Sequence, residues 1–207
     1  EVFFQPFLNG DMPDIVIMRK GSGVYIIEVK DWNLDLYTRG SSNWYVKTGG
    51  ISSQPIKSPI RQVFKYKENL YNLHIDGLLE KRIKNPKFLS IVNCGLYFHK
   101  SNEKEINEFV REQGAERDHD KYLKFLNHFD FLGIDSLTET HLNELLSKRW
   151  LNKPSYLFSD DLYSSFRRYL APPTHILEKG EDLNYSKEQE SIIAADPKLQ
   201  LRVSGVA

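Results

Sequence analysis

The segment from residue 13 to residue 32, PDIVIMRKGSGVYIIEVKDW, constrains the fold of this chain more than any other. Residues 14–18 form an apolar, β-branched run, and residues 24–30 form a second run that ends in Glu28-Val29-Lys30. Gly21-Ser22-Gly23 lies between them, and glycine readily adopts the positive φ that a tight hairpin turn requires. The segment therefore predicts two strands joined by a short turn.

Charged side chains gather at one end of this predicted hairpin. Side chains alternate between the two faces of a strand, so Glu28 and Lys30 point one way, while Ile27 and Val29 pack on the other side. Pairing across the turn places Asp14 near both charged residues. Two carboxylates and a backbone carbonyl are ligands of the kind that Mg²⁺ prefers, and a neighbouring lysine can orient water or offset charge on a phosphate. The pattern is typical of metal-dependent phosphodiester hydrolysis, and a solvated strand end is the alternative.

A helix is predicted from Pro59 to about Asn72, with Ser58 as its N-cap and the proline in the first turn. Gln62 and Tyr66 are four residues apart and therefore share one face of this helix. An ordinary amphipathic helix face is the alternative interpretation of this pair.

The D…E-x-K and Q-x-x-x-Y patterns, in this order, resemble those of RecB-type members of the restriction-endonuclease-like nuclease superfamily. More specifically, residues 1 to about 100 resemble the NERD (nuclease-related) domain in three segments, at 13–14, 27–32 and 59–62. The resemblance implies an α/β fold, a restriction-endonuclease-like core with a central mixed sheet flanked by helices. It also implies cleavage of DNA with Mg²⁺ or Mn²⁺ as cofactor.

The resemblance further implies a role for each residue of the two patterns. Asp14 and Glu28 would bind the metal, with the Val29 carbonyl as a third ligand. Lys30 would position the attacking water or stabilise the transition state. The pair Gln62 and Tyr66 would orient the metal-site residues or the DNA backbone.

Charge is unevenly distributed along a chain whose formal net charge is zero. Residues 55–100 contain nine Lys and Arg against three acidic residues, a net charge of +6. Lys57, Arg61 and Lys65 belong to this basic region and are predicted to contact phosphate groups beside the metal site. A solvated helix face and loop is the alternative interpretation of this basic region.

Other features of the sequence bear on compartment and on competing sites. The single cysteine, Cys94, lies in an apolar run and is interpreted as a buried hydrophobic residue in a reducing, cytoplasmic environment. No apolar run reaches the length of a membrane span, so no membrane partner is predicted.

The cluster Asp118-His119-Asp120 is interpreted as a helix cap rather than a metal site. Trp32 and Trp44 are interpreted as core residues, with base stacking as the alternative.

The remaining elements complete the predicted organisation. Strands are predicted at 2–4, 33–37, 43–46, 88–98 and 131–134, a charged loop at 81–87, and helices at 103–110, 121–129, 138–147 and 159–169. Three parts follow from this reading: a NERD-like core at 1–100, a mainly helical C-terminal extension at 101–181, and the start of another domain at 182–207.

The last part resembles the Q-motif region and first strand of superfamily 1 (UvrD-like) helicases. Gln189 and Gly205 would then take part in ATP binding, although the rest of the P-loop would lie beyond Ala207. The resemblance implies a helicase motor as the partner within a longer chain, and a role in DNA processing or anti-phage defence. A plain helix and strand is the alternative.

Two functions therefore compete. One is a metal-dependent DNA nuclease, and the other is a non-catalytic, nuclease-like module that binds DNA or a protein. An enzyme acting on a small molecule has little support, because the sequence shows no nucleophile motif, no cofactor-binding glycine pattern and no zinc-ligand spacing.

Overall fold

The computed structural model describes residues 1–6, 10–40, 43–47, 54–112, 118–149, 151, 153–171 and 194. The chain divides into two compact units, Glu1–Ala171 and Pro172–Ala207. Apart from Ala194, the second unit lies outside the described residues, and so do Gln189, Gly205 and the predicted helicase-like segment. No helix in the described part of the chain has the length and apolar character needed to cross a membrane.

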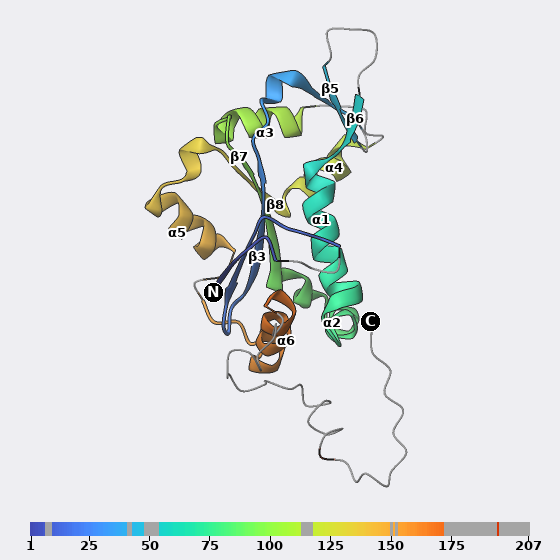
Figure 1. Cartoon of the computed structure of the whole chain (residues 1–207), viewed down its shortest axis with the longest axis vertical. Coiled ribbons are helices and arrows are strands. Elements are labelled where there is room, and N and C mark those ends of the chain that lie inside the picture. The colour runs from blue at the N-terminus through green and yellow to red at the C-terminus, as the bar shows by residue number, and fades with distance from the viewer. Residues whose placement is uncertain are drawn as a thin grey trace, which may run out of the picture. The chain divides into compact units, whose positions relative to one another are not determined.

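A five-stranded mixed sheet forms the centre of the first unit (Figure 1). Its spatial order is β1 (Val2–Phe4), β2 (Ile15–Arg19), β3 (Gly23–Lys30), β7 (Val92–Phe98) and β8 (Phe129–Leu132). The first three strands pair antiparallel, whereas β7 runs parallel to both β3 and β8. The predicted hairpin is confirmed, with Gly21 at a φ of 67° in its turn.

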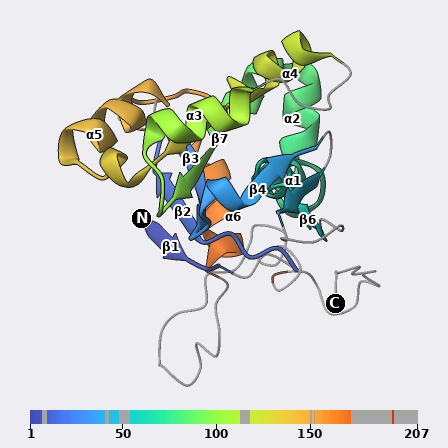
Figure 2. The same ribbon diagram turned by 90° about the horizontal axis from the view of Figure 1, so that it is seen from above.

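Helices flank the sheet on both sides (Figures 1 and 2). The helices are α1 (Pro59–Asn69), α2 (Leu78–Lys84), α3 (Glu103–Arg111), α4 (His119–Leu126), α5 (Glu139–Lys148) and α6 (Asp160–Leu170). One face of the sheet packs against α1, and the opposite face packs against Leu145 of α5. The predicted fold class, α/β with a central mixed sheet flanked by helices, is confirmed.

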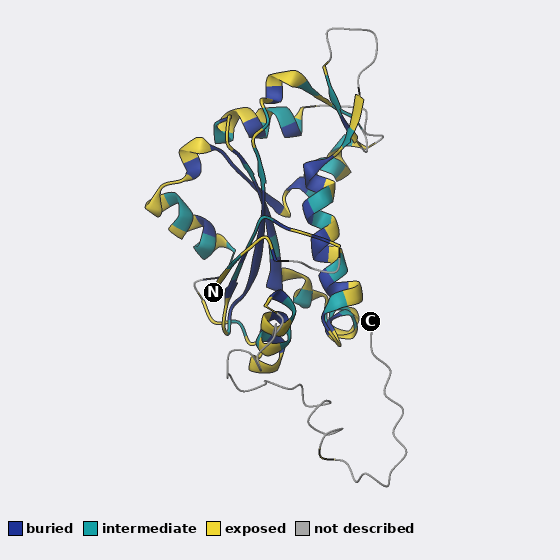
Figure 3. Cartoon of the chain, in the orientation of Figure 1, coloured by how far each residue is buried: buried dark blue, intermediate teal, exposed yellow. Residues whose placement is uncertain are grey.

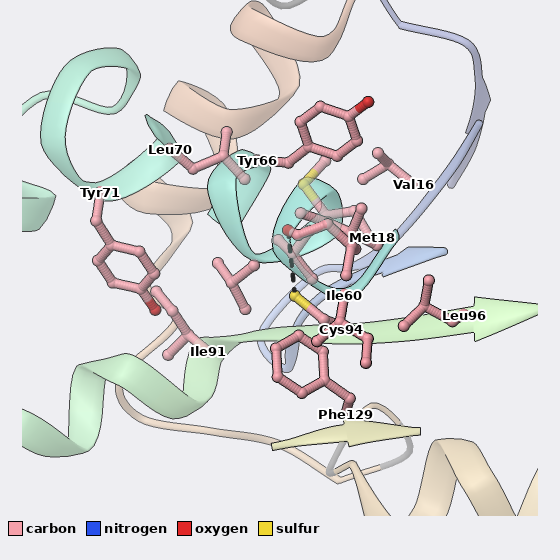
Figure 4. Close-up of a cluster of buried hydrophobic side chains, with 14 of the residues drawn as sticks. Val16, Met18, Ile60, Tyr66, Leu70, Tyr71, Ile91, Cys94, Leu96 and Phe129 are labelled. Carbon is pink, nitrogen blue, oxygen red and sulfur yellow. Dashed lines mark hydrogen bonds between the residues drawn. The ribbon is translucent and has the colours of Figure 1, made fainter. Parts of the chain in front are cut away.

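Strand alternation decides which residues enter the larger hydrophobic core, on the α1 side (Figures 3 and 4). Val16 and Met18 of β2 and Val24 and Ile26 of β3 point to this side and are almost fully buried. Cys94 of β7 lies among them, its thiol directed at the Val63 carbonyl. Burial raises the pKa of this thiol to about 12, so it behaves as the small hydrophobic residue that the sequence predicts.

A second, three-stranded antiparallel sheet consists of β4 (Tyr37–Arg39), β5 (Asn43–Val46) and β6 (Gln54–Lys57). The strand predicted at 33–37 is wrong up to its last residue, because Leu34–Leu36 form a 3₁₀ turn. The Asn33 side chain accepts a hydrogen bond from the Asp35 backbone and favours this turn. Strand β6 was not predicted, since its proline is an unfavourable strand residue that an edge strand tolerates.

Several predicted boundaries shift for local reasons. The predicted loop at 81–87 is wrong up to residue 84, because α2 occupies Leu78–Lys84. The strand predicted from Phe88 begins only at Val92, since Pro86–Ile91 form a 3₁₀ helix whose first turn Asn85 caps.

Helix α1 ends at Asn69 and continues as the π-helical turn Leu70–His74. Ser58 occupies the predicted N-cap position of α1 without a capping hydrogen bond. The predicted helices at 103–110, 138–147 and 159–169 correspond to α3, α5 and α6.

Residues 101–171 belong to the same compact unit as the rest of the sheet, whereas the sequence predicted a separate extension after residue 100. Strand β8 pairs in parallel with β7 as the fifth strand. Phe166 of α6 is fully buried in the same cluster as Val16. These segments complete the α/β core, so the predicted separation at residue 100 does not correspond to a boundary in the structure.

A buried polar network is centred on Asp130 of β8, on the face of the sheet that packs against α5. Asp130 accepts hydrogen bonds from the Tyr25 hydroxyl at 3.0 Å and from Arg149 Nε and Nη2 at 2.5 and 2.7 Å. The Asp130 side chain is only 6% exposed and that of Arg149 14%. Burial, followed by the negative charge of Asp130, raises the pKa of Tyr25 well above its ordinary value. The network therefore combines a paired charge with a neutral phenol.

Gly95 leaves the space that the Tyr25 ring occupies. A Cβ atom at this position would overlap the Tyr25 hydroxyl and lie 2.9 Å from the ring carbon that carries it. We expect Gly95→Ala to lower the free energy of unfolding by about 1–3 kcal/mol, as overpacking does in other cores. Urea denaturation measures this loss. In a Tyr25→Phe background the loss should be smaller because the nearest atom is absent, and an equal loss in both backgrounds would contradict the explanation.

Candidate active site

The hairpin places the predicted acidic residues on the side of the sheet that α1 covers. Ile15 pairs with Ile27, so Asp14 follows in register opposite Glu28 at the end of β3. Glu28 and Lys30 share a face with the core residue Ile26, while Val29 packs on the other face. This alternation directs both charged side chains toward the first turns of α1.

Gln62 connects the strand residues to the helix. Its Nε2 donates hydrogen bonds to Glu28 Oε1 at 2.6 Å and to the Tyr66 hydroxyl at 2.7 Å. Lys30 Nζ lies 2.6 Å from the same Glu28 oxygen and 3.3 Å from Gln62 Oε1. The structure therefore brings four of the five residues of the two patterns into one continuous hydrogen-bond network. Figure 4 shows the Tyr66 hydroxyl pointing away from the buried cluster around Cys94.

The two carboxylate oxygens of Glu28 differ, because one accepts hydrogen bonds and the other has no hydrogen-bond partner among the described residues. Its side chain is only 4% exposed, and Oε1 receives both Lys30 and Gln62. Oε2 is buried without a hydrogen-bond partner among the described residues. Burial raises the pKa of this carboxyl; Lys30 opposes the shift, the charge of Asp14 adds to it, and Lys57 opposes it. A buried oxygen of this kind is costly unless a positive group reaches it.

Asp14, the fifth residue, is fixed by a backbone contact. Asp14 immediately precedes Ile15, the first residue of β2. Its Oδ2 accepts a hydrogen bond at 2.8 Å from the Val29 backbone N–H. The N–H and C=O of one strand residue point to the same neighbouring strand. The Val29 carbonyl therefore faces the same side as the Asp14 carboxylate.

The residue types at this strand end are those that a hard divalent cation takes. Asp14 follows in register opposite Glu28, whose Oε2 is buried without a partner among the described residues, and Mg²⁺ binds carboxylate and carbonyl oxygens while keeping several waters. Within the described residues, no three His, Cys, Asp or Glu side chains are grouped so that they could hold a metal. The set is thus limited to Asp14, Glu28 and the Val29 carbonyl.

Two residues near this network were not predicted as site residues. Asp11 is buried, accepts a hydrogen bond from Asn69 and helps to raise the pKa of Tyr66, for which burial is the largest cause. Met12 contributes its carbonyl oxygen, 3.5 Å from the Tyr66 hydroxyl. The position of Asp11, three residues before Asp14, was the available signal.

The predicted phosphate-binding residues lie at the end of β6 (Lys57) and on the first turns of α1 (Arg61 and Lys65). Lys57, Arg61 and Lys65 are exposed and line a cavity of about 640 Å³. None of the three forms an ion pair with another residue in the described part of the chain. They are therefore available to an anion beside the carboxylates.

The tryptophans take different positions. Trp44 is 2% exposed and stacks on Phe98 with ring centroids 6.1 Å apart, as the core interpretation predicted. Trp32 is half-buried, stacks on Tyr37 at 4.7 Å and has Lys30 Nζ 5.5 Å from its ring centroid. This contact helps to fix Lys30 beside Glu28.

Asp118 caps α4, as predicted, by accepting a hydrogen bond from the Lys121 backbone. This backbone contact, followed by the contact with the Lys121 side chain, lowers the pKa of the Asp118 carboxyl. The Asp118-His119-Asp120 cluster therefore has a structural explanation.

Comparison with known proteins supports a nuclease-like module in the first part of the chain. No curated protein and no solved structure matched the sequence. One family model did match, and the matched region contains Asp14, Glu28, Lys30, Gln62 and Tyr66. Residues 3–93 match the NERD family, the nuclease-related domain.

Proposed function

We propose that residues 1–171 form a metal-dependent nuclease that hydrolyses phosphodiester bonds in DNA. The observation that carries this proposal is the buried, unpartnered Oε2 of Glu28 opposite Asp14. A purely structural carboxylate would be expected to have both oxygens satisfied. The match to the nuclease-related domain supports the same reaction class.

The proposed roles follow from the contacts. Asp14, Glu28 and the Val29 carbonyl would hold Mg²⁺ or Mn²⁺, which when bound lowers the pKa of a water and offsets charge on the scissile phosphate. Lys30 lies next to Glu28 and would orient the attacking water or donate to the phosphate. The water oxygen would form a bond to phosphorus as the bond from phosphorus to the leaving oxygen breaks, with the water proton lost to solvent and the leaving oxygen protonated from solvent. Gln62 is a positioning residue, since it holds Glu28 and Lys30 through its two ends.

Tyr66 anchors the other side of Gln62. Burial and the nearby charges of Glu28 and Asp11 raise the pKa of its phenol, which favours a neutral hydroxyl. A neutral hydroxyl can accept from Gln62 and still donate. Tyr66 therefore fixes the orientation of the Gln62 amide rather than acting as a nucleophile.

Cleavage of supercoiled plasmid tests the proposal. We expect the chain to relax the plasmid with Mg²⁺ or Mn²⁺ and to be inactive in EDTA, because the metal supplies several kcal/mol of charge stabilisation. The Asp14→Asn/Glu28→Gln double variant should remain folded by circular dichroism and should not cut. Cutting in EDTA or by this variant would contradict the metal site. A folded wild-type chain that shifts DNA in a gel without cutting it would instead favour the non-catalytic binding module.

The predicted motor stays a prediction based on the sequence of residues 183–207. The family match ends at residue 93 and does not reach this segment. We propose that a longer chain containing it would bind ATP through Gln189 and the P-loop that begins at Gly205. The proposed role in DNA processing or anti-phage defence rests on the same resemblance. ATP-stimulated cutting by the longer chain would test the motor.

A further inference from the structure

A cavity beside the candidate active site combines an aromatic wall with a basic rim. Phe64 of α1 and Phe125 of α4 are both half-buried, and their rings meet edge to face with centroids 5.2 Å apart. The buried Trp44 also lines the cavity. Figures 1 and 2 show α4 near the part of α1 that adjoins the second sheet. Rings that are neither fully buried nor fully exposed offer apolar surface to a ligand.

The rim carries the charges that a strand of nucleic acid requires. Lys57, Arg61 and Lys65 line the cavity together with one acidic residue, Glu68. Arg61 and Lys65 are four residues apart, so they form a continuous positive edge along α1. A wall of aromatic rings beneath a positive edge is the combination that binds single strands by stacking bases and contacting phosphates.

The cavity and the candidate active site share helix α1. Lys57, Arg61 and Lys65 line the cavity, while Gln62 and Tyr66 of the same helix belong to the active-site network. Arg61 and Lys65 each precede a residue of the active-site network, Gln62 and Tyr66, on the same two turns of helix. A backbone that follows the basic edge therefore leads to the candidate site.

We infer that this cavity receives an unpaired base of a DNA strand whose backbone runs along Lys57, Arg61 and Lys65 toward Glu28. The inference rests on the proposed function and specifies its substrate as single-stranded DNA or a duplex with an unpaired segment. The volume of about 640 Å³ falls within the range of small-ligand sites. A base in a continuous duplex is stacked on its neighbours and would have to leave the stack to enter.

Binding without cleavage tests this inference separately from the nuclease proposal. Fluorescence anisotropy in EDTA would compare a short thymidine oligonucleotide with the same strand carrying abasic residues at its centre, and with a blunt duplex. We expect the intact strand to bind about tenfold more tightly than the abasic strand, as for stacking sites elsewhere. Equal affinities for the two strands would overturn the inference, whether or not the chain cuts DNA with Mg²⁺.

Substitutions of single phenylalanines test whether the preference for the intact strand arises in this cavity. Phe125→Leu keeps an apolar side chain of similar size but removes the aromatic ring, so it should abolish the preference for the intact strand. Phe88→Leu, a half-buried phenylalanine outside the cavity, is the matched control and should keep that preference. A folded Phe125→Leu variant that binds as the wild type does would contradict the base site. If Phe125→Leu did not fold, the two-strand comparison on the wild type would still decide.

Two further binding measurements test the inference independently: removal of positive charges from the chain, and replacement of the DNA strand by an RNA strand. Arg61→Ala/Lys65→Ala should weaken binding of both strands and reduce the salt dependence, because two phosphate contacts are lost. Lys81→Ala/Lys84→Ala, with the same charge change on the exposed side of α2, should leave both unchanged. Equal effects of the two double variants would overturn the placement of the strand. An RNA strand that bound more tightly than the DNA strand would overturn the assignment to DNA.

Discussion

Replacing Glu28 by glutamine is expected to reduce metal-dependent cleavage by about a thousandfold or more. The substitution keeps the size of the side chain and an oxygen for Lys30, but it removes the charge of one of two carboxylates in the proposed metal site. A loss of several kcal/mol of metal-dependent stabilisation corresponds to a rate change of this order. Single-turnover cleavage at saturating DNA measures it without a contribution from binding.

The same substitution is expected to change stability in the opposite direction. Burial raises the pKa of Glu28 above its ordinary value of 4.5, so the folded state disfavours the ionised form relative to the unfolded chain. The stability that protonated Glu28 contributes is therefore present at low pH and lost as pH rises through the raised pKa. Thermal melting should show Glu28→Gln becoming more stable relative to wild type as pH rises from about 4.5 toward neutrality.

Metal and matched variants separate these effects. A cation that binds only the folded state raises its melting temperature, so Mg²⁺ should stabilise the wild type near neutral pH but not Glu28→Gln. Glu80→Gln makes the same chemical change at an exposed position of α2 and should alter neither cleavage nor the response to Mg²⁺. Equal stabilisation of wild type and Glu28→Gln by Mg²⁺ would place the metal elsewhere.

Replacing Asp130 by alanine is expected to cause a large loss of stability, about 3–5 kcal/mol. Arg149 and the Tyr25 hydroxyl, both hydrogen-bonded to this carboxylate, would lose their partner in a largely buried environment. The melting temperature should fall by roughly 10 °C for a domain of this size. Differential scanning calorimetry measures the change.

A double variant tests the origin of the loss. Asp130→Ala/Arg149→Met removes both charges of the buried pair, so it should recover much of the stability that the single variant loses. Asp118→Ala removes an exposed aspartate that caps α4 and pairs with Lys121, so it should cost less. A double variant less stable than Asp130→Ala would show that Arg149 contributes independently of Asp130.

Local patterns in the sequence predicted the hairpin and helix α1 because short-range chemistry determines both. The alternation of Ile26, Ile27 and Glu28 specifies which face each side chain occupies, and Pro59 specifies where the helix begins. These elements bring Glu28 and Gln62 together. Their proposed catalytic roles remain predictions.

Features that depend on distant contacts were not predictable in the same way. Strand β6 contains Pro55 and is stabilised by pairing with Tyr45 rather than by its own propensity. The position of β8 in the sheet depends on contacts with β7 that no local pattern encodes. Asp130 within the apolar run Phe129–Leu132 was a signal, because a charge in a buried strand needs a partner. The sequence did not identify that partner as Arg149.

The central position of β3 also affects when the site can form during synthesis. Its pairing with β2 is local, joining Arg19 to Gly23, but its pairing with β7 joins Val24 to Val92. A nascent chain emerges N-terminus first, and contacts between distant segments form only after both have left the ribosome. The pairing that places β3 at the centre of the sheet can therefore form only after residues 92–98 have emerged. Translation thus imposes a delay between the synthesis of the active-site residues and the assembly of the site that they form.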